Sequence, residues 1–217
     1  AQLVIYNGLG YDDWMKKLLN ASRDNRKKVI VVGTDVAGKK SGDNEHVWYD
    51  PGTMPKLAEA VAARLSELDP PHADEYRQNA RRYIDSLAPL NELIARLKQP
   101  APAPVAVSEP VFDYLLQALN MTVTNGKFAK AVEEETDPAP GDVARLTDDI
   151  DNKNIRLFFR NVQTDSPLIR QFAERAKQNG IPVVEVTEFQ PAGKSYVQWM
   201  TDQLLQVEKA IGARPSP

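Results

Sequence analysis

A regular stripe of apolar residues between His72 and Lys98 is the feature that most limits the folds open to this chain. Its members recur at alternating spacings of four and three residues, namely Tyr76, Ala80, Tyr83, Leu87, Leu90, Ile94 and Leu97. This spacing places them on one face of a single helix. At 1.5 Å per residue the helix is roughly 40 Å long, which is more than one small domain needs, so we expect it to bridge two lobes. Pro89 should kink this helix rather than end it.

Buried strands and helices alternate on both sides of the long helix. Before it, the pattern predicts strands at 2–8 and Val29–Val32, and helices at Tyr11–Ala21 and Pro55–Leu68. The proline-rich segment 99–104 then opens a second run. That run has predicted strands at Val105–Ser108, Ile155–Phe159 and Pro182–Val186 and helices at Val111–Leu119, Pro140–Asp151, Pro167–Asn179 and Lys194–Ile211.

Strands that are joined by helices pair in parallel, because each connection must cross back over the sheet. The predicted fold class is therefore α/β, with two lobes of parallel sheet covered by helices and bridged by one long helix. The expected division is 1–71 for the remainder of the N-terminal lobe, 72–98 for the linking helix and 99–217 for the C-terminal lobe.

Composition excludes several classes of function. With 217 residues, 42% of them apolar, the chain can form real cores. A net charge of -3, with both signs mixed along the chain, provides no basic surface for nucleic acid or an anionic membrane. The absence of cysteine excludes disulfides, cysteine-ligated zinc and thiol catalysis. Neither a signal peptide nor a transmembrane helix is predicted within these residues, and a neutral small ligand or a cation fits best as partner.

The segment Gly33–Lys40 nearly matches the phosphate-binding loop of nucleotide hydrolases. Lys40 stands where that loop requires a Ser or Thr for magnesium. The residues that follow do not begin a helix whose N-terminus could hold phosphate. A nucleotide hydrolase is therefore the less favoured alternative, and we expect an exposed loop.

His46 is the strongest candidate ligand, because it lies beside Trp48 and Tyr49 at the end of a glycine-rich loop. Neutral imidazole is a favoured ligand of divalent transition metals, although a lone histidine can also be a plain surface or core residue. The segment resembles the Pro-His-Val-Trp-x-x-Pro hallmark of the metal-binding family of ABC transporter substrate-binding proteins, which serve zinc, manganese and iron importers. His46, Val47, Trp48 and Pro51 match it. The opening Tyr6–Gly10 and the long helix are also similar, so the resemblance covers nearly the whole chain.

The resemblance implies a second ligand at Glu109, where the family usually has His before a Phe-x-Tyr pair. Phe112 and Tyr114 keep that pair here. Glutamate is a competent oxygen ligand, so the replacement shifts the expected site toward oxygen-rich coordination. The ligand set then no longer indicates one particular metal. Taken alone, Glu109 before Pro110 is better explained as an acid favoured by a helix N-terminus.

The resemblance implies a third ligand at Glu188, where the family commonly has Asp after its last strand. Glu185, which alternates with valines on that strand, is the alternative third ligand. A shift of one residue in the strand register would exchange the faces that the side chains occupy. The family ordinarily has a further His on a loop near the start of the mature protein, and no counterpart is present here. We expect either an N-terminally shortened chain, which we favour, or a site with only His46, Glu109 and Glu188. His72 matches no ligand position and is expected to cap the long helix.

The predicted function is capture rather than catalysis. The resemblance implies an extracytoplasmic protein that binds a divalent transition metal, Zn or Mn, in a cleft between the lobes and delivers it to a membrane ABC permease. We expect no enzymatic activity, no nucleic acid partner, a monomer, and a location in the periplasm or, as a lipoprotein, on the extracellular face of the membrane. Two alternatives stay open: the same fold binding an iron chelate or haem, and a surface interaction protein that does not transport.

Overall fold

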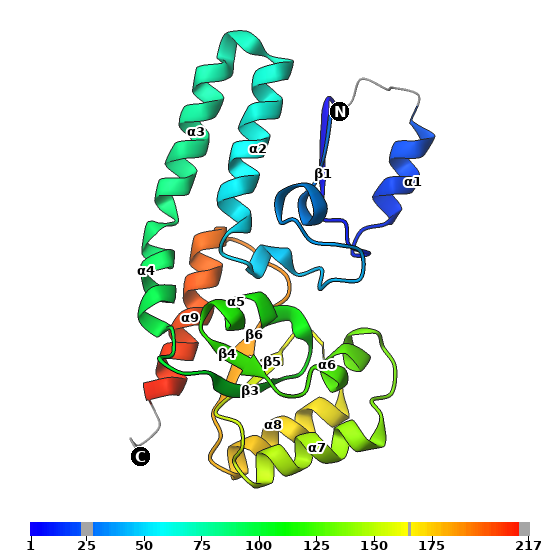
Figure 1. Cartoon of the computed structure of the whole chain (residues 1–217), viewed down its shortest axis with the longest axis vertical. Coiled ribbons are helices and arrows are strands. Elements are labelled where there is room, and N and C mark those ends of the chain that lie inside the picture. The colour runs from blue at the N-terminus through cyan, green and yellow to red at the C-terminus, as the bar shows by residue number, and fades with distance from the viewer. Residues whose placement is uncertain (23–27, 165, 213–217) are drawn as a thin grey trace. The chain divides into compact units, whose positions relative to one another are not determined.

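The computed structural model describes residues 1–22, 28–164 and 166–212. The chain divides into two compact units, residues 1–88 and 89–217. Figure 1 shows the first unit in blue and cyan and the second in green through red. Both units combine parallel strands with helices, which confirms the α/β class predicted from the sequence. Among the described residues, no helix is both long enough and apolar enough to cross a membrane.

The first unit is built on a two-stranded parallel sheet. Strand β1 (Leu3–Tyr6) pairs with β2 (Lys28–Val31) in the register Leu3 to Lys28. The other elements of this unit are α1 (Trp14–Ala21), η1 (Val32–Val36), η2 (Val47–Tyr49), α2 (Thr53–Leu68), η3 (Pro70–His72) and α3 (Ala73–Ser86). Helix α2 packs along α3, and the two form the hairpin seen in Figure 1. This hairpin is the most extensively packed part of the unit.

The first unit leaves much apolar surface uncovered. Helix α1 has no buried residue, and its Trp14 and Leu18 side chains are 58% and 59% exposed. Ile5 of β1 is 41% exposed. Between α2 and α3 runs a mainly apolar groove of about 330 Å³, lined among others by Leu57 and Tyr83. Because a two-stranded sheet is only marginally stable alone, the stability of this unit rests largely on its helices.

The long helical stripe forms two consecutive helices, α3 and α4 (Ala88–Leu97), separated by Leu87. Leu87 keeps helical dihedral angles (φ -82, ψ -9), and its N–H donates to the carbonyl of Ile84 at 3.0 Å. Pro89 has no N–H for the carbonyl four residues earlier, that of Asp85, which accounts for the irregular turn here. The expected single helix is therefore interrupted at Leu87, and the division between the units falls one residue later.

The second unit contains a four-stranded, wholly parallel sheet in the order β4-β3-β5-β6. Its strands are β3 (Ala103–Val107), β4 (Met121–Val123), β5 (Phe158–Asn161) and β6 (Val183–Val186). Its helices after α4 are η4 (Pro110–Phe112), α5 (Asp113–Ala118), α6 (Gly126–Glu133), α7 (Pro140–Asp151), α8 (Pro167–Gln178) and α9 (Tyr196–Gly212). The core lies where the sheet meets α6, α7 and α8, and it is centred on Phe128, Leu146, Phe158 and Phe172.

Most predicted elements of the second unit are present, although several bounds differ and two elements are additional. Strand β4 and helix α6 were not predicted, and β5 begins at Phe158 rather than at Ile155. Helix α8 ends at Gln178, and Gly180, two residues later, has a φ of 74, in the left-handed region that glycine adopts without strain.

Candidate metal site

His46 lies on the loop of the first unit that leads into η2, and only 2% of its surface is exposed. Its ring nitrogen Nδ1 lies 2.8 Å from Oδ1 of Asn44. The same oxygen accepts the backbone N–H of His46 at 2.8 Å, which fixes the orientation of the amide. Because Oδ1 can only accept, Nδ1 carries the proton and Nε2 is the unprotonated nitrogen, the form of the ring that can coordinate a metal ion.

Burial lowers the pKa of His46 to about 4. The imidazole is therefore neutral near pH 7, which is the state that binds metals. Aromatic rings surround it: the Trp48 ring centroid lies 5.1 Å from that of His46, and the Tyr11 centroid lies 6.4 Å away, both edge-on. The tautomer and the orientation of the ring are both set before any ion binds.

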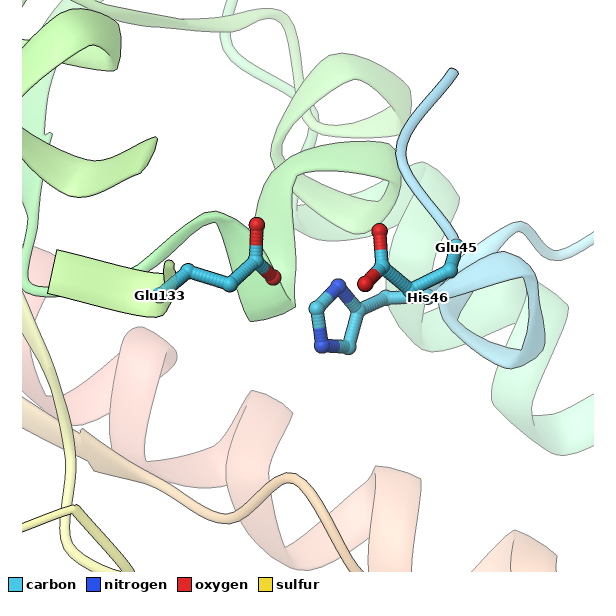
Figure 2. A group of neighbouring side chains, drawn as sticks. All are labelled: Glu45, His46 and Glu133. Atoms are coloured by element: carbon cyan, nitrogen blue, oxygen red, sulfur yellow. The ribbon is translucent and has the colours of Figure 1, made fainter. Parts of the chain in front are cut away.

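The turn after β1 holds the His46 loop in place. Asn7 follows the strand and donates its side-chain amide to the carbonyl oxygen of Glu45 at 2.9 Å. The Asp12 carboxylate accepts the backbone N–H groups of Asn7 and Gly8, each at 2.7 Å. Figure 2 shows the Glu45 and His46 side chains on this loop, and also Glu133, the last residue of α6 in the second unit.

In the second unit, Glu109 follows β3 and is 8% exposed. Its Oε2 accepts a hydrogen bond from Nδ2 of Asn161 at 2.8 Å. Asn161 ends the neighbouring strand β5, is 1% exposed, and donates its backbone N–H to Oγ of Ser108 at 2.9 Å. These residues lie at the carboxyl ends of parallel strands, the edge at which α/β sheets place their ligand sites.

Glu188 lies at the same edge of the sheet, two residues after β6, and is partly buried. The preceding residue, Thr187, is bound by two side chains of α9. Its N–H donates to Oε1 of Gln203 at 2.9 Å, and its Oγ1 accepts the indole N–H of Trp199 at 2.8 Å. The backbone that carries Glu188 is thereby fixed to the last helix.

The alternative carboxylate, Glu185, lies within β6 and is exposed. It is the cross-strand partner of Arg160, and the two charged groups approach to 3.9 Å. A carboxylate near a cationic side chain on an open strand face is better explained as a surface ion pair. The structure thus places Glu109 and Glu188 at one sheet edge in the second unit, and His46 in the first unit.

Two other candidates from the sequence have structural explanations. The nucleotide-like segment begins within the helical turn η1, where Gly33 and Val36 are buried, so the expected exposed loop is only partly present. Its Lys39 pairs with Asp50 at 3.6 Å. His72 stands at the N-cap of α3 as expected, but its side chain makes no cap hydrogen bond. It is paired instead with Oδ2 of Asp69 at 2.8 Å.

Three residues with distinctive environments were not predicted from the sequence. Asn44 and Asn161 orient candidate ligands, yet single asparagines in loops or at strand ends carry no distinctive pattern. Asp113, the first residue of α5, has an Oδ1 atom that is buried without a hydrogen-bond partner among the described residues. Burial raises the pKa of Asp113 to about 7. Acids are common in the first turn of a helix, so its position gave no indication of this environment.

Comparison with known proteins gives a uniform result. Residues 1–210 match the family model described as zinc-uptake complex component A, periplasmic. The iron-binding protein YfeA of Yersinia pestis is 26% identical over 191 residues, which cover 83% of this chain and 60% of that protein. The metal ABC transporter substrate-binding lipoprotein ScbA of Streptococcus cristatus is 24% identical, with 97% of this chain and 73% of that protein covered. The chain thus spans about three fifths to three quarters of the length of these relatives.

Solved structures show the same fold. The SBP FpvC of Pseudomonas aeruginosa in complex with Ni²⁺ superposes with a TM-score of 0.78 at 23% identity, covering 100% of this chain and 80% of that chain. The periplasmic zinc binding protein TroA of Treponema pallidum gives a TM-score of 0.76 at 20% identity, covering 97% and 81%. The match of the family model across nearly the whole chain settles the assignment: this chain belongs to the family of zinc-uptake complex component A.

Proposed function

We propose that this chain is the metal-capturing, substrate-binding component of an ABC importer. The ligand is a divalent transition metal ion, Zn(II) or Mn(II), held by His46, Glu109 and Glu188. The observation that carries the proposal is the buried, neutral imidazole of His46, whose Nδ1 is bound to Asn44 so that Nε2 is the unprotonated nitrogen. Relatives of the chain are named as iron-binding, manganese-binding and zinc uptake proteins.

The proposed donor set suits a +2 ion. Two carboxylates neutralise its charge. Imidazole adds a nitrogen donor, which transition metals bind more readily than calcium or magnesium does. Capture requires no bond-making chemistry. The ion exchanges water for these ligands, and the bound ion is then passed to a permease. Because several relatives are named lipoproteins of metal ABC transporters, we place this step outside the cytoplasm.

Calorimetric titration with Zn(II) and Mn(II) tests the role of His46. We expect His46→Ala to weaken metal affinity by more than about 100-fold, because the loss of a direct ligand should exceed the 10–100-fold typical of an outer-shell partner. His72→Ala is the matched control, since the His72 side chain is exposed and paired with Asp69. Equal affinities of His46→Ala and the unmodified chain would contradict the proposal.

Metal analysis of the purified protein distinguishes a bare ion from an iron chelate or haem.

The same titration shows whether Glu188 or Glu185 is the metal ligand near strand β6. We expect Glu188→Gln to weaken binding strongly, because it removes a charged donor from the sheet edge. Glu185→Gln should leave affinity unchanged, because Glu185 lies on the exposed face opposite Arg160. The reverse outcome would transfer the ligand role to Glu185.

A further inference from the structure

The loop after β5 connects the two carboxylate segments of the second unit through side-chain hydrogen bonds. Asn161 donates from Nδ2 to Oε2 of Glu109 at 2.8 Å, and its Oδ1 accepts the backbone N–H of Gln163 at 3.0 Å. The Gln163 side chain in turn makes two hydrogen bonds with the backbone of Phe189. Oε1 accepts the Phe189 N–H at 2.8 Å, and Nε2 donates to the Phe189 carbonyl at 3.5 Å. This path runs from Glu109 to the residue directly after Glu188.

We propose that Asn161 and Gln163 are positioning residues, which hold Glu109 and the peptide of Glu188 in a fixed relation before the ion binds. The inference rests on the proposed function, because it assumes that both glutamates are ligands. It adds a role for the loop after β5 that neither the sequence pattern nor the family match assigns.

Asn161 suits this role because its amide is itself immobilised. Besides Glu109 and Gln163 it reaches Thr164, whose Oγ1 lies 3.3 Å from Nδ2, and the Asn161 side chain is almost fully buried. An amide orients a carboxylate without neutralising it, whereas a lysine or arginine in this place would compete with the metal for the same charge. Glu109 is thus held in one orientation and keeps its negative charge for the cation.

Gln163 suits the role because the segment after β6 has no regular structure of its own up to α9. Thr187 is fixed by Gln203 and Trp199, so Gln163 supplies the second attachment, on the other side of Glu188. Restraining the backbone on both sides reduces the conformational entropy that Glu188 loses when it binds an ion. Loss of either attachment should therefore weaken binding even though the ligand itself remains.

Calorimetric titrations of the chain with Zn(II) and with Mn(II) test this role. Gln163→Met keeps the length of the side chain and removes both bonds to Phe189, and we expect about tenfold weaker affinity. Asn161→Ala should weaken affinity by roughly 10–100-fold, the range typical of second-shell partners. Gln163→Glu retains the acceptor for the Phe189 N–H and should restore most of the affinity. Gln178→Met, at an exposed position of α8, is the matched control.

Two readouts separate positioning from general stability. The melting temperature of metal-free Gln163→Met should equal that of the unmodified chain, because Gln163 is exposed. The electron paramagnetic resonance spectrum of bound Mn(II) at saturation should broaden in Gln163→Met, because the ligand geometry becomes heterogeneous.

The possible failures are distinguishable. If Glu109→Gln and Glu188→Gln weaken binding while Asn161→Ala and Gln163→Met do not, the positioning role is wrong and the proposed function stands. If Gln163→Met weakens binding only in proportion to a loss of metal-free stability, the loop is merely structural and the inference is overturned. If the unmodified chain binds neither ion, the proposed function and the inference fail together.

Discussion

Asp113 shows at the scale of one residue how burial makes stability depend on pH. It begins α5, and burial raises its pKa to about 7, against about 3.9 for an aspartate in an unfolded chain. Between about pH 4 and pH 7 the folded protein therefore keeps a proton that the unfolded chain has lost. The contribution of this group to stability is greatest below about pH 4 and declines as the pH rises toward 7.

Replacing Asp113 with Asn should remove this pH dependence, because an amide of the same shape does not titrate. At pH 8 we expect Asp113→Asn to be more stable than the unmodified chain by about 1–2 kcal/mol, after allowance for partial contact of the group with solvent. Near pH 4.5 the two should differ little. Urea denaturation at both pH values, with a chelator present, measures the difference, and Asp137→Asn at an exposed position is the control. An equal difference at both pH values would show that Asp113 is ionised in the folded state.

The residues of the site differ in how far the sequence could predict them. His46 stands in a local motif with Val47 and Trp48, so sequence alone identified it as a candidate. Asn161 acts on Glu109 from a position 52 residues away in the chain, and that contact exists only because β3 and β5 are neighbours. Side-chain partners of this kind depend on strand order, which single-sequence patterns do not determine.

At the scale of elements, predictability followed length and amphipathic pattern. Helices α7, α8 and α9 are 12, 12 and 17 residues long and were predicted with small errors at their ends. Strand β4 has only three residues, and α6 has eight. Short elements offer few repeats of a periodic pattern, and tertiary packing rather than local preference stabilises them. An irregularity near Pro89 was predictable because proline acts locally, but the sequence pattern predicted one continuous helix rather than α3 and α4.

Two helices of this chain should respond very differently to the same substitution. Leu18 on α1 is 59% exposed, whereas Leu146 on α7 is fully buried in the core of the second unit. We expect Leu18→Ala to change the free energy of unfolding by no more than about 0.5 kcal/mol. Leu146→Ala should cost about 2–5 kcal/mol, because it removes buried methyl groups and leaves a cavity. Chemical denaturation of both variants measures this contrast, and comparable losses would mean that another surface covers α1 in solution.

At the scale of the whole molecule, the proposed ligands belong to both compact units. His46 lies in residues 1–88, and Glu109 and Glu188 lie in residues 89–217. A ligand that binds only the folded state raises stability by RT ln(1 + [L]/Kd), about 2.7 kcal/mol at a ligand concentration of 100 times Kd. If one ion uses donors from both units, this stabilisation requires the ligands of each.

Thermal unfolding with added Zn(II) or Mn(II) therefore tests whether the two units share one ion. The melting temperature of the metal-free chain should rise with the logarithm of metal concentration once the site is saturated. His46→Ala removes a donor from the first unit and Glu109→Gln removes one from the second, and we expect each to abolish most of the rise. The double variant should lose little more than either single variant, because residues acting on one ion are not additive. Glu185→Gln should keep the full rise, since Glu185 lies opposite Arg160 on an exposed strand face. A rise that survives in either single variant would mean that one unit alone holds the ion.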